Sequence, residues 1–434
     1  MEHFKTSFLY FFTTLLICLS PHINAQTDQW IDKNESENYV ARHECSFVQA
    51  GDRFIMFGGR EQAQRLDVYN FETDTWSQGG NAPKEFNHFQ ATFYEGFIWV
   101  IGSFKTNTFP NEIPADHIWL YFPPTKMWIK GPEIPKDRRR GGAGLALYND
   151  KFYLVGGNTK GHNGGYVNWF DVYNPKTNSW TVLENAPHAR DHFSCVVADN
   201  KIYALGGRHS GGEGGVFKPL IAPVDVYDFK TNRWTHLNYP LPTPRAAPSV
   251  ALFSNELFVM GGEGAKKGPA YKLVEAYNLK TEAWSRKADM HYPRHGTQAI
   301  VSGNGIYIAG GSPKRGGGRQ HNMEVYNSDA PKGSSIIPSE LKHSETECVP
   351  VGKEASIKIK NKGGNSGCFI NSIIIEGEHA DTFQLLDDYS LKLIKNKQDL
   401  QLKVKYLGDT KNDTAKMVIT YNGNLKTSVL LKSK

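Results

Sequence analysis

The sequence predicts an all-β protein. Six four-stranded sheets are expected to form a closed ring, a β-propeller, and an immunoglobulin-like β-sandwich follows. The first observation is a unit that recurs along residues 26–328. The second is that the last unit lacks its final strand, whereas a matching segment stands before the first unit. The third is a C-terminal region without tryptophan in which polar and apolar residues alternate, the pattern of half-buried strands.

Residues 1–25 are predicted to be a secretory signal peptide that precedes the ring. Lys5 gives a basic start, the segment FLYFFTTLLICL (8–19) is apolar, and Ala25 is a small residue at the expected cleavage site. The apolar run is too short for a typical membrane-spanning helix, although an uncleaved anchor is the alternative. We therefore expect a soluble, exported protein that is periplasmic, on the cell surface or secreted, with no membrane span in the mature chain.

Each unit of the repeat carries a glycine pair, followed by a tyrosine and, seven residues after the tyrosine, a tryptophan. Successive tryptophans are 52, 52, 54 and 50 residues apart. The glycine pairs lie in MFGGR (56–60), LVGGN (154–158), ALGGR (204–208), VMGGE (259–263) and IAGGS (308–312), with VIGSF (100–104) in the second unit. The aromatic pairs are Tyr69/Trp76, Tyr121/Trp128, Tyr173/Trp180, Tyr227/Trp234 and Tyr277/Trp284.

Four short strands are expected in each unit. A hairpin precedes each glycine pair, and its tip carries Asn, Asp or Gly, as in YNDKF (148–152), residues that tolerate the positive φ of tight hairpins. The glycines allow the second strand to end in a bend where a side chain would clash. The tryptophan is expected on the fourth, outermost strand.

The last unit is predicted to be completed by the start of the mature chain. EVYN (324–327) supplies Tyr326, but Gly333 stands where the tryptophan should be. TDQWI (27–31) contains Thr27 three residues before Trp30, the spacing seen in the other units. An N-terminal strand that joins the sixth sheet would close the ring and remove its two free edges.

This pattern resembles the kelch family of β-propellers over residues 27–328. The resemblance rests on the glycine pair, the tyrosine and the tryptophan, which keep their register in the successive units. It implies a six-bladed propeller with a rigid scaffold and variable loops.

The C-terminal region is predicted to be a second domain. Residues 329–341 form a linker, and residues 342–434 form an immunoglobulin-like β-sandwich. The segments PVGKEASIKIKNKGG and IEGEHADTF resemble domains of the ASH/Hydin type. Cys348 and Cys368 are the predicted disulfide, because export exposes thiols to oxidation. Cys45 and Cys195 are predicted on opposite inner strands, too far apart for a disulfide, and therefore as buried free thiols.

Candidate ligand-binding residues cluster at the expected mouths of the inner strands. Sixteen residues before the first glycine of each unit stand Arg42, Phe86, Arg140, Arg190, Arg245 and Arg294. Five guanidinium groups around one opening could hold a carboxylate or a phosphate. In the kelch consensus, arginine at this place often bonds the backbone, so a structural role is the alternative.

The neighbours of these arginines are less typical of the repeat. Glu44, His88, His192 and His295 are the candidate catalytic residues, because carboxylates and imidazoles can move protons. The candidate ligand-binding set consists of the five arginines, His88, His192 and Tyr292. No segment has metal-ligand spacing or a phosphate-binding loop, so neither a metal nor a cofactor is predicted.

The expected function is recognition of a glycan, with an acidic sugar favoured, or of a protein ligand at the loop face of the propeller. A formal net charge of +6 over 434 residues does not favour a nucleic-acid partner. The sequence leans away from catalysis without excluding it. Exported six-bladed kelch proteins are similar to sialate mutarotases, which implies an isomerase acting on an acidic sugar as the alternative.

Two further enzyme classes remain open. One is a polysaccharide lyase that uses His, Tyr and Arg from the same mouth. The other is a copper radical enzyme similar to galactose oxidase, for which HYPRH (291–295) would supply His291, Tyr292 and His295.

Overall fold

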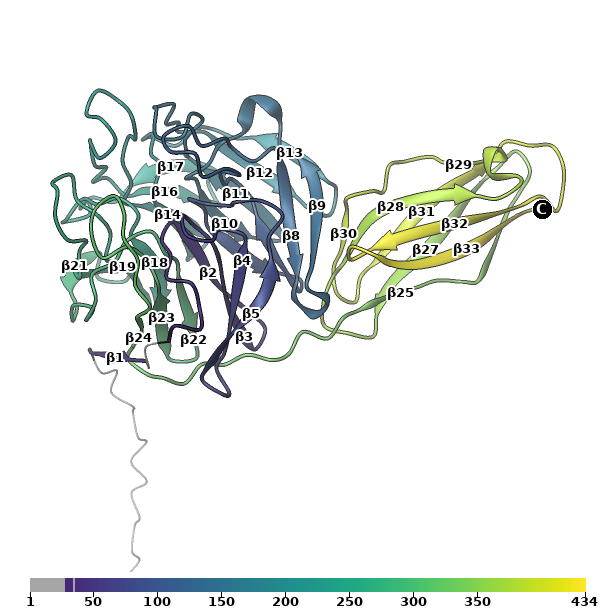
Figure 1. Cartoon of the computed structure of the whole chain (residues 1–434). Coiled ribbons are helices and arrows are strands. Elements are labelled where there is room, and N and C mark those ends of the chain that lie inside the picture. The colour runs from purple at the N-terminus through teal and green to yellow at the C-terminus, as the bar shows by residue number, and fades with distance from the viewer. Residues whose placement is uncertain (1–27, 34–35) are drawn as a thin grey trace, which may run out of the picture.

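The structure is a computed structural model that describes residues 28–33 and 36–434. The predicted signal peptide, residues 1–25, lies outside the described residues. These residues form a propeller from which a β-sandwich projects, and the C-terminus lies at the far end of the sandwich (Figure 1). No helix within residues 28–33 and 36–434 combines the length and apolar character needed to cross a bilayer.

The described part of the propeller contains six four-stranded antiparallel sheets, its blades. Blade one contains β2 (Cys45–Ala50), β3 (Arg53–Gly58), β4 (Arg65–Asn70) and β5 (Thr75–Asn81). Blade two contains β6 (Ala91–Tyr94), β7 (Phe97–Val100), β8 (His117–Phe122) and β9 (Met127–Glu133), with the 3-10 turns η1 (Pro123–Thr125) and η2 (Lys136–Arg138). Blade three contains β10 (Gly144–Tyr148), β11 (Lys151–Val155), β12 (Phe170–Asn174) and β13 (Ser179–Val182).

The other three blades repeat this order from the axis outward. Blade four contains β14 (Ser194–Ala198), β15 (Lys201–Leu205), β16 (Asp225–Asp228) and β17 (Arg233–His236). Blade five contains β18 (Ser249–Phe253), β19 (Glu256–Met260), β20 (Val274–Asn278) and β21 (Ala283–Arg286). Blade six contains β22 (Ala299–Ser302), β23 (Gly305–Ala309), β24 (Met323–Tyr326) and, from the start of the chain, β1 (Trp30–Asp32).

The predicted closure of the ring is confirmed. Strand β1 pairs antiparallel with β24, and Trp30 lies opposite Tyr326, with 5.4 Å between the ring centroids. The Trp30 side chain is 5% exposed, and its indole N–H donates to the carbonyl of Ala288 at 2.9 Å. Because β2 also packs beside β22, the first and last blades are neighbours and the ring is closed.

The repeated residues take the places that the pattern predicts. Tyr69 and Trp76 are cross-strand partners in blade one, with ring centroids 5.2 Å apart. Gly59 has a φ of +95°, and a Cβ at this position would stand 2.4 Å from the carbonyl oxygen of His43. Asn149 and Asp150, at a hairpin tip, have φ values of 44° and 63°. The repeat therefore encodes turns and blade packing.

The second domain is a sandwich of two sheets. One sheet has the order β25-β27-β31-β29 and the other β26-β33-β32-β28-β30. Its core consists of apolar side chains from both inner faces, such as Ile357 and Val404 of the first sheet and Ile419 and Leu431 of the second. Membership of the ASH/Hydin type stays a prediction. The strands are β25 (Glu340–Lys342), β26 (Thr346–Val349), β27 (Glu354–Lys362), β28 (Cys368–Glu376), β29 (Phe383–Leu385), β30 (Leu393–Ile394), β31 (Asp399–Tyr406), β32 (Thr414–Tyr421) and β33 (Leu425–Ser433), with the 3-10 turn η3 (Ala380–Thr382).

The predicted disulfide between Cys348 and Cys368 is wrong, because both are free thiols. Cys348 lies on β26 and Cys368 on β28, and β33 and β32 lie between these strands in the sheet. Three strand spacings of about 4.8 Å separate them by roughly 14 Å, far beyond the reach of a disulfide. Cys45 and Cys195 are buried free thiols, as predicted.

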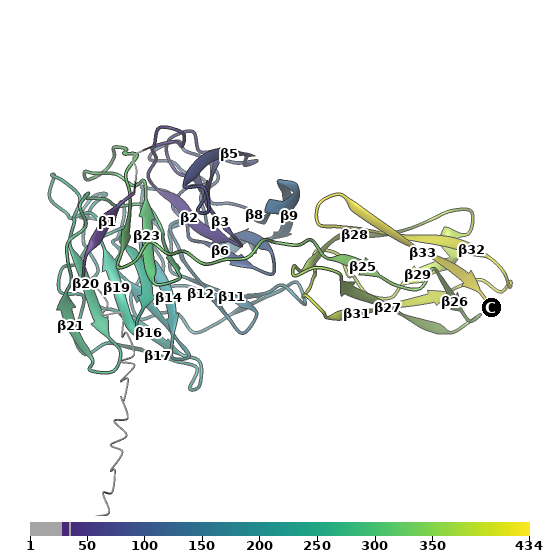
Figure 2. The same ribbon diagram turned by 90° about the horizontal axis from the view of Figure 1, so that it is seen from below.

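The sandwich contacts the edge of the propeller formed by the β-turns of blades two and three (Figure 2). The backbone N–H of Gly367 donates to Glu95, and that of Leu393 donates to Pro175, each at 2.8 Å. Phe369 packs against Trp99, with ring centroids 6.0 Å apart. Hairpin turns and long loops lie on opposite faces of a propeller blade, so the sandwich leaves the loop face open.

Replacing Trp30 with alanine should destabilise the whole propeller by about 3–5 kcal/mol, the usual cost of truncating a buried large aromatic side chain. Urea unfolding followed by tryptophan fluorescence would measure the loss. Val182→Ala is the matched control on an outer strand, because the Val182 side chain is 61% exposed; its effect should stay within about 0.5 kcal/mol. Equal stability of the Trp30 variant and the wild type would contradict the closure.

Candidate functional site

The six blades are joined around the axis by a closed ring of backbone hydrogen bonds. The bonds run from His88 N to Glu44 O (3.0 Å), Gly142 N to His88 O (2.8 Å), His192 N to Gly142 O (3.1 Å), Ala247 N to His192 O (2.6 Å), Gly296 N to Ala247 O (3.0 Å) and Cys45 N to Gly296 O (3.2 Å). We call the six residues Glu44, His88, Gly142, His192, Ala247 and Gly296 the axial collar.

Every residue of the axial collar adopts the left-handed conformation, with φ between 47° and 68°. Glycine adopts this conformation without strain, whereas other residues rarely do. Glu44, His88 and His192 are nevertheless present here, and their side chains are buried. Strain held at one place in a fold is a reason to look for function there.

A pocket of about 330 Å³ opens above the collar on the loop face. Its lining combines aromatic, charged and imidazole side chains, namely His43, Glu44, Arg60, His88, Asn107, Phe109, His162, Arg208, Val216, Phe217, Glu263 and Gly316. This is the size of a small-molecule site.

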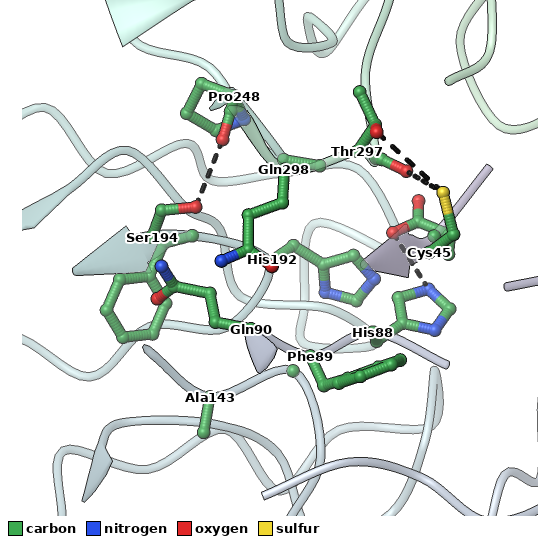
Figure 3. A pocket seen from close by; sticks show the side chains of 15 residues that line it. Cys45, His88, Phe89, Gln90, Ala143, His192, Ser194, Pro248, Thr297 and Gln298 are labelled. Carbon is green, nitrogen blue, oxygen red and sulfur yellow. Dashed lines mark hydrogen bonds and ion pairs between the residues drawn. The ribbon is translucent and has the colours of Figure 1, made fainter. Parts of the chain in front are cut away.

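Below the collar the axial channel narrows to a cavity of about 40 Å³. Figure 3 shows His88 and His192 side by side among the side chains that line this cavity, together with Gln90 and Gln298. The Gln90 amide accepts from the backbone N–H of Leu145 and of Cys195. Gln298 donates to the carbonyl of Ala91. These two glutamines bridge inner strands of different blades and close the floor of the pocket.

Glu44 is surrounded by imidazoles. One of its oxygens lies 3.5 Å from Nε2 of His88 and the other 3.6 Å from Nε2 of His295. Burial raises the pKa of Glu44, but His192, His295 and His43 lower it, and its pKa ends below the ordinary value. Glu44 is therefore an ionised carboxylate in a buried site.

His295 lies between two carboxylates. Its Nε2 is 3.6 Å from Glu44 and 3.5 Å from Glu263, and neither ring nitrogen has a hydrogen-bond partner. Burial lowers the pKa of His295, and the two carboxylates only partly offset this effect. A neutral imidazole between two carboxylates can accept or return a proton.

The five predicted arginines are placed behind the collar, not in the pocket. Each is at most 1% exposed. Arg190, for example, donates to Asp225 at 2.9 Å and to the carbonyls of Ala204 and Gly206. The carboxylate partners of Arg42, Arg140, Arg190, Arg245 and Arg294 are Asp67, Asp171, Asp225, Glu275 and Glu324, in that order. This geometry gives the arginines the structural role that was the alternative.

A sequence signal for this role exists. In the five units with arginine, an Asp or Glu stands two residues before the repeated tyrosine. The second unit has Phe86 instead of the arginine and Trp119 instead of the acid. These two rings pack edge-on, with centroids 6.2 Å apart. The ion pair of the other five blades is thus replaced by an aromatic pair in blade two.

The other predicted residues divide between the pocket and the rim. His88, His192 and His295 are buried near the axis together with Glu44. Tyr292 is partly buried beside His291 and does not line the pocket. His291 is exposed and pairs with Asp32 at 2.6 Å. The two histidines of the segment HYPRH (291–295), His291 and His295, therefore lie in different surroundings and do not form one copper site.

Several pocket residues were missed by the sequence analysis. Arg60, Arg208 and Glu263 each follow a glycine pair directly, and this varying position was the available signal. Arg60 pairs with Glu112, and Arg208 pairs with Glu263. Glu112 belongs to the long loop of blade two, where no local pattern marks it.

Comparisons with known proteins agree with this architecture. The family profile described as KLHDC2/KLHL20/DRC7 Kelch-repeats domain matches residues 21–207 and 131–311, more than half of the chain. The chain belongs to the kelch-repeat family. Among solved structures, the propeller is similar to the one titled "Structure of YjhT", with a TM-score of 0.57 and 16% identity over 67% of this chain and 95% of that chain. At this identity the kelch fold alone is shared.

Two kelch relatives match this chain over only part of their own length. Kelch-like protein terF of Aspergillus terreus is 29% identical over 286 residues, which is 62% of this chain and 61% of the relative. Beta-scruin of Limulus polyphemus is 20% identical over 320 residues, 70% of this chain and 34% of the relative. The chain thus spans between a third and three fifths of the length of these two proteins.

Replacing Arg190 with alanine should destabilise the kelch propeller by about 3–5 kcal/mol, because the buried carboxylate of Asp225 would lose its guanidinium partner and keep only His188. Arg233→Ala, on the exposed outer strand of the same blade, is the control and should change stability by less than about 0.5 kcal/mol. Chemical denaturation of both variants measures the difference. If Arg190→Ala were as stable as the control, the structural role of the arginines would be refuted.

Proposed function

We propose that the chain is a binding protein that takes a small polar group of a glycan into the axial pocket, with an acidic sugar as the expected class. The observation that carries the proposal is the pocket of about 330 Å³, which suits a monosaccharide. Sites of this kind combine apolar walls with a few well-placed polar groups.

The walls support sugar recognition. Phe217 lies 4.2 Å from the guanidinium carbon of Arg315, and Phe109 lies 5.9 Å from that of Arg60. Aromatic faces of this kind can pack against the apolar face of a sugar ring. Arg60 and Arg208 face the pocket, so they, and not the five blade arginines, would hold a ligand carboxylate.

A protein ligand is the alternative partner. Membership of the kelch family favours a binding module in general, and Phe109 is 59% exposed at the rim. The buried histidines and Glu44, however, lie below this rim in a space too small for a folded partner. A glycan, or a single side chain of a partner, fits this depth better.

We also propose that the protein acts outside the cytoplasm, as the predicted signal peptide implies. The intact mass of the protein recovered from its native host should then correspond to a chain that begins at Gln26. A mass that includes residues 1–25 would contradict cleavage at this site.

The sugar proposal predicts saturable binding of a free acidic monosaccharide. Calorimetry with N-acetylneuraminic, glucuronic and galacturonic acid, and with glucose as the neutral comparison, should show binding of at least one acid. Phe217→Ala should weaken it by about tenfold or more, which is about 1.4 kcal/mol. Tyr239→Ala removes an aromatic side chain that is 62% exposed and does not line the pocket, and it should leave the affinity unchanged.

Absence of binding by all three acids at millimolar concentration would refute the acidic-sugar class. Unchanged affinity in Phe217→Ala would refute the location. A partner that binds the propeller equally well when Phe217 and Glu44 are both replaced would favour the protein-ligand alternative at another surface.

Proton transfer on the bound sugar is the second candidate function, and the position of His295 between Glu44 and Glu263 favours it. An isomerase similar to sialate mutarotases would speed the exchange of the two anomers. Proton NMR of the same samples would detect faster exchange, which Glu44→Gln should abolish while retaining sugar binding. No acceleration over buffer would leave binding as the whole function.

A further inference from the structure

We propose that His88, His162 and His192 form a binding site for one divalent transition-metal ion at the floor of the axial pocket. The inference does not rest on sugar binding, because it follows from the placement of the three imidazoles alone. No metal was expected from the sequence, since the three residues come from three separate segments and form no linear motif.

The three imidazoles converge on one point from different blades. One ligand nitrogen from each ring lies within 4.8 Å of the others. The ring centroids are 4.5 Å apart for His88 and His192, 5.1 Å for His88 and His162, and 5.0 Å for His162 and His192. His88 and His192 belong to the axial collar, and His162 lies on the loop between β11 and β12.

Each ring has its Nδ1 held by an oxygen acceptor. Nδ1 of His162 donates to Glu112 at 3.0 Å, and Nδ1 of His192 donates to Asp191. Nδ1 of His88 lies 2.6 Å from the amide oxygen of Asn87. A carboxylate accepts only, so the proton stands on Nδ1 and the lone pair on Nε2. Such support is usual for histidines that bind metals.

The orientation of Asn87 is itself determined by its surroundings. Its amide nitrogen donates to the carbonyls of Glu85 and Thr106, each at 2.9 Å. The amide oxygen must therefore face His88. All three imidazoles then carry their free lone pair on Nε2.

The Nε2 atoms lack good partners of their own. Nε2 of His192 is buried and has no hydrogen-bond partner, although a buried polar atom left unpaired is costly. Nε2 of His162 is 3.5 Å from Arg208, beyond the usual range of a hydrogen bond. A metal ion would satisfy all three nitrogens at once.

The surroundings favour a cation. Metal ions bind the neutral form of imidazole. The charged side chains of the pocket and of the groups directly behind it are the carboxylates of Glu44, Glu61, Glu112, Asp191 and Glu263 and the guanidiniums of Arg60 and Arg208. With neutral imidazoles these groups sum to a net negative charge.

Three neutral imidazoles without a thiolate suit Zn²⁺, Cu²⁺, Ni²⁺ or Fe²⁺. For a tetrahedral Zn²⁺ with bonds of about 2.0–2.1 Å, the nitrogens would stand roughly 3.4 Å apart, so the rings must approach one another by about 1 Å. Glu44, 3.5 Å from Nε2 of His88, lies beside the fourth position. Three protein ligands with an open fourth position are typical of zinc sites that act on a ligand.

The test uses the purified full-length mature chain without an affinity tag, stripped with a chelator and titrated with Zn²⁺ by calorimetry. One ion per chain should bind at micromolar concentration or below. Co²⁺ should give the visible absorption bands of a four-coordinate ion with nitrogen ligands. Absence of saturable one-to-one binding, or a purely octahedral Co²⁺ spectrum, would overturn the proposal.

The Zn²⁺ affinity of single-residue variants tests where the ion binds. His162→Gln should lower Zn²⁺ affinity by about 100-fold or more, and Glu112→Gln, which removes the support of His162, by about 10–100-fold. His43→Gln is the matched control, because His43 lines the same pocket and pairs with Glu61 in the same way at 3.1 Å, yet lies outside the cluster. It should bind Zn²⁺ as the wild type does.

An equal loss in His43→Gln and His162→Gln would place the ion elsewhere in the pocket and overturn the assignment. Thermal unfolding of each variant shows whether the propeller is intact. If His162→Gln does not fold, X-ray absorption of the zinc-loaded wild type decides, because three imidazole ligands are expected and a different number would refute the site.

Discussion

The ring of backbone hydrogen bonds at the axial collar is the constraint on which the rest of the structure depends. Five of the six bonds join a left-handed residue of one blade to its counterpart in the next, and the sixth joins Cys45, the neighbour of Glu44, to Gly296. Strand β1 pairs with β24, so that blade six has four strands like the other blades. The left-handed backbone conformation of the collar residues directs their side chains toward the axis.

Charged and polar side chains have two separate roles around this ring. Behind the collar, an arginine in five of the blades pairs with a carboxylate of the third strand and with backbone carbonyls, which satisfies buried polar groups. Phe86 and Trp119 show that an apolar pair can fill the same volume. Near the axis, by contrast, Nε2 of His192 and both ring nitrogens of His295 have no hydrogen-bond partner. These unpartnered imidazole nitrogens lie near the axis, where a ligand or an ion can reach them from the loop face.

The sequence predicted which residues lie near the pocket better than it predicted what those residues do. Glu44, His88, His192 and His295 were singled out because they depart from the repeat, and all four lie near the axis. The arginines attracted attention because they recur, but recurrence in a repeat marks what every blade needs for its own packing. His162 could not be recognised from the sequence, because the shape of a long loop decides where its side chain lies.

The sequence by itself determined the blades, their number and the strand that closes them, because turn residues and period-two burial are local properties that repeat in register. It also determined that a second β-domain follows. Only the tertiary structure decided which side chains share the axial pocket, and that Cys348 and Cys368 lie three strands apart. These residues come from segments that are far apart in the chain, and local residue preferences do not determine how far apart such segments lie in space.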